Sequence, residues 1–180
     1  NESTVVTLDN SFVMAHQQSQ VSAHGNSTVK AVDKSNVKAY DDSSVWSWGN
    51  SKVLARDNVR VNALGSSAVR AEVLAVVKAK EKSSVEALSR STVIAEDSTT
   101  VAAQHFAVVY AYGESMVDAE DQVAVMASGD STIRARETAT VQVNSSRTTV
   151  DAGETVPIVV HVPNNNITGG VVIDVAGVPN

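Results

Sequence analysis

The chain has 180 residues, a length that suits one domain or one elongated element with a tail. With two Trp, three Tyr, two Phe and no Cys, the composition excludes a core of large aromatic side chains, a disulfide framework and a thiolate metal site. A net charge of −6 argues against a nucleic-acid partner, and no apolar run approaches the roughly 20 residues that a membrane helix needs.

A period of eight residues runs through most of the chain. From Val5 to Val141, eighteen positions spaced by eight hold seventeen valines and Ile133, without insertion or deletion. Fifteen of the eighteen residues two places later are Ala, and small residues, mostly Ser, lie two places before. Alternation of Ser, Val and Ala with variable residues predicts a strand with one buried face in every octad.

Pairs of turn-forming residues close most octads, for example Asp9-Asn10, Gly49-Asn50 and Gly65-Ser66. Such residues tolerate positive φ and hydrogen-bond to their own backbone, so each strand is expected to end in a corner. A single strand of this kind cannot bury its face, whereas stacked coils can. The sequence therefore predicts an all-β fold, a β-solenoid (β-roll) over residues 1–145.

The corner glycines bear on how many octads form one coil. Gly49, Gly65, Gly113 and Gly129 are separated by multiples of sixteen, and among the octads only Gly25 falls outside this class. The small inward residues also suit two sheets that lie close together. We therefore expect two octads and 16 residues per coil, hence about nine coils and a rod roughly 43 Å long. A coil of three octads stays open, as does the handedness.

The period breaks in residues 146–180. With Arg147 as an inserted residue, Thr148, Val150 and Ala152 align as a nineteenth octad. Beyond it we expect two strands, in 156–163 and 171–175, that could form a hairpin, because Pro157 and Pro163 argue against a central solenoid strand. We expect this non-repeat β segment to cap the last coil, whose free backbone groups would recruit other chains. The alternative is that it opens a further β domain.

Outward positions differ between alternate octads. Octads containing Val13, Val29, Val45 and so on carry more large apolar residues and fewer charges than the octads between them. Exposed apolar patches mark contact surfaces, and aromatic residues are enriched at their hot spots. We predict a rigid structural module that contacts a second copy or another protein through this face. The predicted contact residues are Trp46, Trp48, Ile94, Phe106, Val108, Tyr110 and Tyr112. The alternative is that they only shield their own sheet.

The Ser-x-Val-x-Ala octads resemble the Ser/Asn-x-Val-x-Ala arrays of bacterial and phage-associated proteins. They are more loosely similar to the ice-binding β-roll of ryegrass, whose coils also stack Val between two sheets. This resemblance covers residues 3–145 and implies solenoid architecture but no activity. The chain starts at Asn1 rather than Met, so we expect a processed or excised piece of a longer protein, extracellular or particle-associated.

Other functions stay open from the residues alone. Ice binding is one, although outward Thr residues do not line up over adjacent coils, and glycan binding through Trp46, Trp48, Tyr110 and Tyr112 is another. The four histidines lie far apart, and no His-carboxylate cluster has the spacing of metal ligands. We therefore expect no enzyme activity, no metal and no cofactor.

Overall fold

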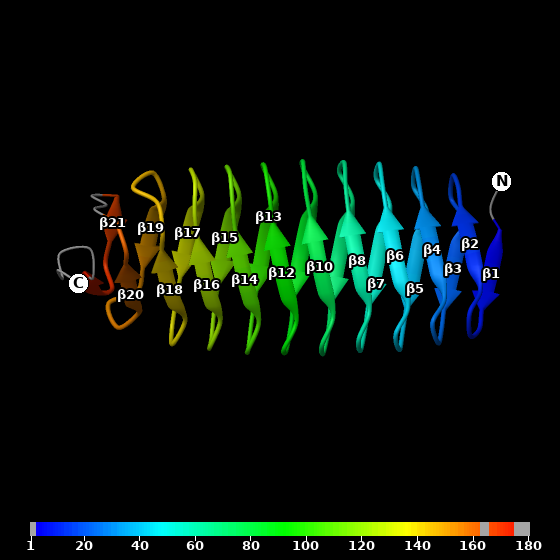
Figure 1. Cartoon of the computed structure of the whole chain (residues 1–180), viewed down its shortest axis with the longest axis horizontal. Helices are drawn as coiled ribbons and strands as arrows, with labels where there is room; N and C mark the ends of the chain where they lie inside the picture. The colour runs from blue at the N-terminus through cyan, green and yellow to red at the C-terminus, as the bar shows by residue number, and fades with distance from the viewer. Residues whose placement is uncertain (1–2, 163–165, 175–180) are drawn as a thin grey trace.

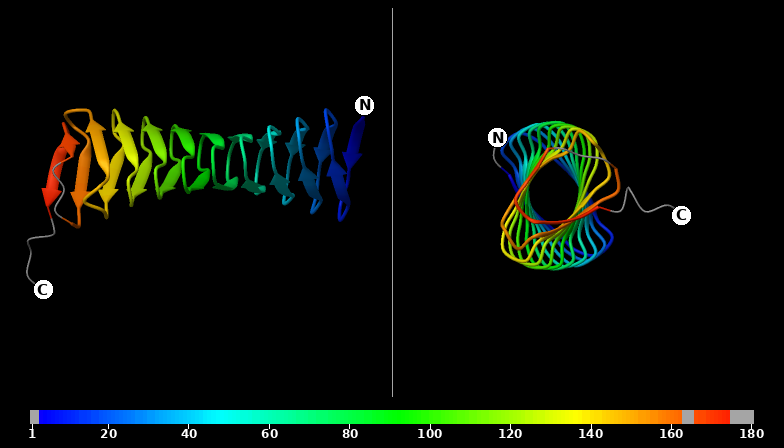
Figure 2. Two further views of the ribbon diagram at one scale, coloured as in Figure 1. Left: turned by 90° about the horizontal axis from the view of Figure 1, so that it is seen from above. Right: turned by 90° about the vertical axis from the view of Figure 1, so that its left-hand side faces the viewer.

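The computed structural model describes residues 3–162 and 166–174, and in this part of the chain every regular element is a β-strand. Short strands wind into a rod of stacked coils (Figure 1). Seen end-on, the coils nearly superimpose, and each is turned slightly relative to the one before (Figure 2). The all-β solenoid predicted from the octads is confirmed.

The strands separate into two parallel eleven-stranded sheets. Sheet A holds the odd-numbered strands, β1 (Thr4–Thr7), β3 (Gln20–Ala23), β5 (Asn36–Ala39), β7 (Lys52–Ala55), β9 (Ala68–Ala71), β11 (Ser84–Ala87), β13 (Thr100–Ala103), β15 (Met116–Ala119), β17 (Thr132–Ala135), β19 (Thr149–Ala152) and β21 (Ile167–Thr168). Sheet B holds the even-numbered strands, β2 (Phe12–Ala15), β4 (Thr28–Ala31), β6 (Ser44–Ser47), β8 (Arg60–Ala63), β10 (Val76–Ala79), β12 (Thr92–Ala95), β14 (Val108–Ala111), β16 (Ala124–Ala127), β18 (Thr140–Val143), β20 (Pro157–Val160) and β22 (Val171–Asp174).

Neighbouring strands of one sheet pair residues that are one coil apart in sequence. Val77 lies beside Val61 on one side and Val93 on the other, so one coil contains two octads and sixteen residues. The two-octad prediction is therefore confirmed, and strands β1 to β18 form the nine predicted coils. Gly49 and Gly65 consequently lie at the same edge of the rod, as their spacing indicated.

The core lies between the two sheets and consists of the residues predicted to point inward. Val29, Val77 and Val109 have no exposed surface, and Ala31 and Ala79 are equally buried. These side chains are small, so the sheets can approach closely and fill the interior without large aromatic residues.

A buried serine at the start of most strands ties the corner to the core. Ser83 Oγ donates to the carbonyl oxygen of Lys80 at 2.6 Å, and Ser43 Oγ donates to that of Tyr40 at 2.7 Å. In the described part of the chain, the buried hydroxyls of Ser91, Ser115 and Ser131 have no hydrogen-bond partner. The hydroxyl group of this buried serine therefore has a hydrogen-bond acceptor in some coils and none in others.

Replacing this serine by alanine should therefore affect the free energy of unfolding differently at Ser83 and at Ser91, which occupy equivalent positions in their octads. Ser83→Ala should lower the free energy of unfolding by about 1 kcal/mol, because it removes a buried hydrogen bond. Ser91→Ala should leave stability unchanged or raise it, because it removes a buried hydroxyl that has no partner. Denaturant unfolding followed by circular dichroism measures both, and equal losses would contradict the assignment.

One residue adopts positive φ at each corner from Asp9 to Glu137, as at Asp33 (φ 62°) and Asp97 (φ 58°). The sequence predicted that corner carboxylates bond within their own turn. The hydrogen bonds observed for these carboxylates reach the coil before instead. Asp33 Oδ2 accepts the N–H of Gln17 at 3.2 Å, and Asp97 Oδ2 accepts that of Glu81 at 3.3 Å. Corner carboxylates thus satisfy backbone donors of a neighbouring coil and help to stack the rod.

The C-terminal segment continues both sheets. Val150 on β19 pairs with Ile133, one residue beyond the usual spacing, so the nineteenth octad with its inserted residue is confirmed. Strands β20 and β22 are parallel neighbours in sheet B, so the expected hairpin is wrong. The argument from Pro157 is also wrong, because this proline is the first residue of β20, where a missing N–H is tolerated.

Pro163, residue 175 and the five residues after it lie outside the described residues. The choice between a cap and a further domain stays a prediction.

Candidate functional site

The predicted contact residues lie on sheet B or at the corner beside it. They are Trp46 and Trp48 on and directly after β6, Ile94 on β12, Phe106 in the corner before β14, and Val108, Tyr110 and Tyr112 on and directly after β14. Trp46, Phe106 and Tyr112 are 41%, 54% and 44% exposed. The other four are partly buried. All seven are therefore at the surface, as the alternation predicted.

The two tryptophans stack on each other. Their ring centroids are 6.0 Å apart and the rings are inclined by 18°. They occupy outward positions two residues apart, so each covers part of the other. On the neighbouring strands, Trp46 lies beside Lys30 and Asn62. The neighbours of Trp46 are therefore polar, whereas Val32 and Leu64 occupy the positions one coil before and one coil after Trp48.

A second group is apolar over several adjacent strands. Ile94, Tyr110 and Met126 lie side by side on β12, β14 and β16, and Val108 lies beside Ala124. We call Ile94, Phe106, Val108, Tyr110, Tyr112 and Met126 the Tyr110 patch. Met126 was not among the predicted contact residues, although its outward position on the same face was readable from the octads.

The structure separates the tryptophans from the Tyr110 patch. Strands β8 and β10 lie between β6 and β12, and their outward residues include positively charged side chains. Lys78 and Lys80 on this intervening surface bind Glu96 with N–O distances of 3.0 and 2.5 Å. The hydrogen bond from Lys80 holds the pKa of Glu96 below its usual value, with a further contribution from Lys78. The predicted contact residues therefore form two separate surfaces, the tryptophan pair and the Tyr110 patch.

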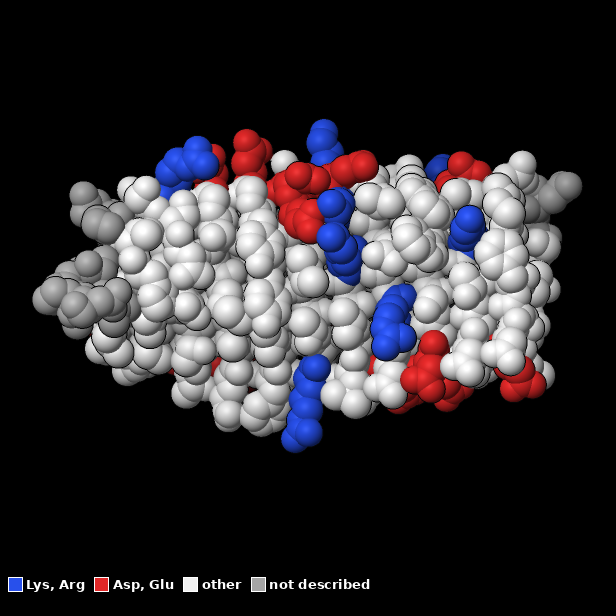
Figure 3. Space-filling view, in the orientation of Figure 1, with Lys and Arg blue, Asp and Glu red and all other residues white. Residues whose placement is uncertain are grey.

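Sheet B is uncharged at its outward positions from β14 to β20. Figure 3 shows this face, with a broad uncharged area towards the C-terminal end and charged side chains along the edges and in the N-terminal half. The row that contains Tyr110 and Met126 continues through Gln142 to Val159 and Ile173. Sequence reasoning missed the last two because it did not assign their strands to the solenoid.

Two corners on one edge of the rod, Val73-Leu74 before β10 and His105-Phe106 before β14, lack turn-forming residues. Val73, Leu74 and Phe106 are exposed and line a groove together with Arg90 and His105. Val73 has φ 66°, a conformation that a β-branched residue rarely adopts. A valine thus occupies a corner position where Gly, Asn or Asp would fit without strain, and its backbone is strained. Such strain is often retained where a surface has a function.

Sheet A carries a network of ion pairs instead. Glu72 binds Arg56 at 2.7 Å and Arg70 at 2.8 Å, and Arg70 also binds Glu86 at 2.9 Å. The hydrogen bond from Arg70 is the largest influence that lowers the pKa of Glu72, followed by the one from Arg56. The network links three successive coils across the sheet.

Acid should weaken the rod through Glu72. A carboxyl group with a lowered pKa in the folded state contributes stability that is complete above its unfolded pKa and is lost as pH falls through its folded pKa. Stability should therefore decline below about pH 4.5. Glu72→Gln should make this decline shallower by up to about 1 kcal/mol, since the pair lies at the surface.

The measurement is the melting temperature of both proteins as a function of pH. Glu114→Gln is the control, because Glu114 is exposed and forms no ion pair within the described residues. A wild-type pH profile in the Glu72 variant would contradict the prediction.

Comparisons with protein-family models, curated proteins and solved structures gave no match. The resemblance to the bacterial and phage-associated arrays and to the ryegrass roll therefore stays a prediction.

The described residues also lack two features that would indicate other functions. No three His, Asp or Glu side chains among them are grouped so that they could hold a metal ion. No helical segment in this part of the chain has the length and hydrophobicity of a membrane span.

Proposed function

We propose that the protein is a non-catalytic structural rod that associates with a second copy of itself through the C-terminal half of sheet B. The observation that supports this most strongly is the surface from β14 to β20, whose outward positions are uncharged, together with the Tyr110 patch that it adjoins. A face without charges can be buried without leaving an unpaired ion in the interface. Two identical faces can meet around a two-fold axis, which is the commonest arrangement in homodimers.

The two apolar corners on the adjoining edge, with positive φ at Val73 and His105, support the same assignment. Phe106 and Leu74 extend the apolar area around the edge of the rod, and both are exposed in the single chain. The stacked tryptophans lie outside the proposed interface, because β8 and β10 separate them from it. Their role in association is therefore expected to be smaller than that of Tyr110.

The experiment is the molar mass in solution, measured by light scattering over a range of protein concentrations. We expect a wild-type dimer and a monomer for the double variant Tyr110→Ser/Met126→Ser. The matched control is Tyr40→Ser/Leu54→Ser, which removes an aromatic and an apolar residue from outward positions of sheet A and should leave the dimer intact. Circular dichroism checks that all three proteins are folded.

A wild-type monomer at high concentration would overturn the proposal, as would a dimer that persists in the Tyr110 variant. Dissociation caused by Trp46→Ser/Trp48→Ser, with no effect of the Tyr110 variant, would move the interface to the other half of sheet B.

Ice binding gains little support from the arrangement of threonines. Thr132 and Thr149 do lie side by side on β17 and β19, which the sequence reasoning missed because of the inserted residue. One such pair is not a lattice, and Arg134 and Asp151 lie beside each other on the same two strands. We expect no freezing-point hysteresis in a nanolitre osmometer, and a clear hysteresis gap would favour ice binding over self-association.

A further inference from the structure

The N-terminal half of sheet A carries a group of lysines close to one another. Lys38 and Lys52 point outward from β5 and β7, and Lys34 lies in the corner before β5. None of the three forms an ion pair within the described residues, whereas Lys78 and Lys80 on sheet B are both paired with Glu96. This local excess of positive charge lies in a chain whose net charge is −6.

Side-chain amides surround these lysines. Gln18, Gln20, Asn36 and Asn50 line one hollow together with Lys34 and Lys52. No hydrogen bond joins these four amide groups to another described residue, although the backbone of Gln20 and Asn36 is bonded to neighbouring coils. An amide offers both donors and an acceptor, so it can bind a hydroxyl group from either side. The hollow thus combines sites for hydroxyls with sites for anions.

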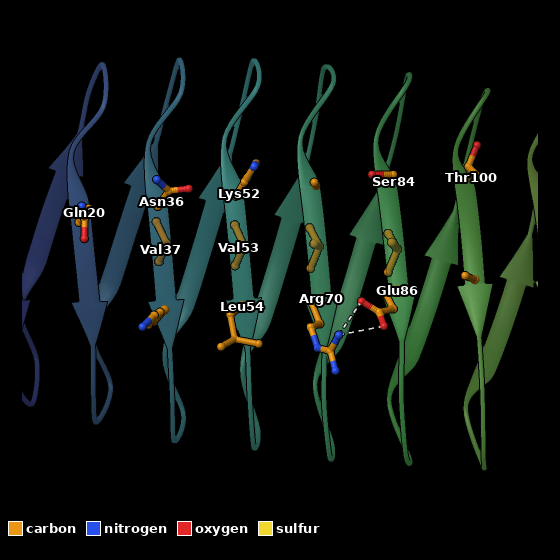
Figure 4. Close-up of a pocket in the computed structure, with 15 residues that line it drawn as sticks. Gln20, Asn36, Val37, Lys52, Val53, Leu54, Arg70, Ser84, Glu86 and Thr100 are labelled. Carbon is orange, nitrogen blue, oxygen red and sulfur yellow. Dashed lines mark hydrogen bonds and ion pairs between the residues drawn. The ribbon is translucent and has the colours of Figure 1, made fainter.

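A second hollow extends the first along the rod. It shares Gln20, Asn36 and Lys52 with the first hollow and continues over β9 and β11 to Thr100 on β13. Figure 4 shows Gln20, Asn36, Lys52, Ser84 and Thr100 at corresponding places on successive strands of sheet A. Ala68 and Ser84 have small side chains, so they project little from sheet A in the middle of this row of residues. The surface therefore forms a shallow trough there.

The trough is suited to a linear ligand that lies along the rod. It crosses six strands, which corresponds to roughly 24 Å at the spacing of strands in a sheet. Its one lining carboxylate, Glu86, is bound by Arg70 at 2.9 Å and so does not oppose an anion. The cations therefore face the ligand without an acidic competitor in the trough.

We propose that this trough binds a linear anionic polysaccharide, a polymer of sugars whose carboxylates contact Lys34, Lys38 and Lys52 and whose hydroxyls contact the amides. Single-stranded nucleic acid is less suitable, because its bases stack on aromatic side chains or on free Arg. No aromatic residue lines either hollow, and Arg70 is engaged by Glu72 and Glu86. The site is separate from the proposed interface, which lies on the other sheet.

The test uses polygalacturonate as the probe and isothermal titration calorimetry at an ionic strength of about 0.1 M, where the Debye length is about 10 Å. The variant Lys34→Gln/Lys38→Gln/Lys52→Gln should bind at least about ten-fold more weakly than the wild type, equivalent to about 1.4 kcal/mol. The matched control is Lys82→Gln/Arg90→Gln/Arg134→Gln, which changes the net charge equally at unpaired exposed positions outside the trough. The control should bind within about two-fold of the wild type, because screened charges act over only about a Debye length.

A second variant separates recognition of the sugar from attraction to any polyanion. Gln20→Ala/Asn36→Ala keeps every charge, so it should weaken binding of polygalacturonate and leave its salt dependence unchanged. Equal loss in both triple variants would overturn the proposal, as would wild-type affinity in the amide variant. Binding of poly(dT) as strong as that of polygalacturonate, and lost in the same lysine variant, would show a general polyanion surface instead. An absence of binding to polygalacturonate would also reject the site.

Discussion

Val77→Asp is expected to unfold the rod at temperatures where the wild type is stable. Val77 is completely buried between Val61 and Val93, in the middle of sheet B. An aspartate there would place a carboxylate in an interior that offers no donor for it, and it would also remove an apolar side chain. The free energy of unfolding should fall by at least about 4 kcal/mol. Each coil contacts only its neighbours, so a defect at this point divides the rod into two shorter pieces.

The neighbouring residue provides the control for this substitution. Val76 is on the same strand but points outward and is 39% exposed. Val76→Asp should change the free energy of unfolding by less than about 1 kcal/mol, because its carboxylate stays in water. Denaturant unfolding followed by circular dichroism compares the two variants. Similar stabilities would show that the inward and outward positions are assigned wrongly.

Ala79→Leu is expected to have the next largest effect, a loss of about 3 kcal/mol. Ala79 is buried beside Ala63 and Ala95, so the alanines of successive coils form a column close to the corner. Leucine adds three carbon atoms where neighbouring coils leave room for a methyl group. The two sheets would have to move apart locally, and the strain would pass to the coils on either side.

Ala102→Leu on β13 is the matched control, because Ala102 points outward and is exposed. It should leave the melting temperature almost unchanged. An equally small effect of Ala79→Leu would mean that the interior contains unfilled space at this level. The small size of the alanine side chains would then not explain why the two sheets lie so close together.

The sequence determined the strands and their inward faces, because both depend on local patterns. The alternation of Ser, Val and Ala is visible within each octad, and it correctly assigned Val77 and Ala79 to the interior. The spacing of Gly49 and Gly65 correctly indicated two strands in each coil. In a regular stack every coil repeats the one before, so a local period is enough to define the architecture.

The irregular end shows where local pattern stops being sufficient. From the sequence alone, Pro157 argues against a solenoid strand and the last two strands are predicted to form a hairpin, whereas β20 and β22 are parallel neighbours in sheet B. A proline is compatible with a strand when its nitrogen is at the strand's first position, and only the register of β18 and β20 reveals that position. The loops between these strands also vary in length, so the period does not predict their pairing.

Only the tertiary structure decided which outward side chains meet. It separated Trp46 and Trp48 from Tyr110 and placed Met126 beside Tyr110. It also placed Lys34, Lys38 and Lys52 around one trough. It also showed that Asp33 bonds to the coil before it. Inward residues repeat in every coil, so the sequence alone predicts their neighbours. Outward residues vary from coil to coil, and their contacts depend on stacking, side-chain direction and the space left by smaller neighbours.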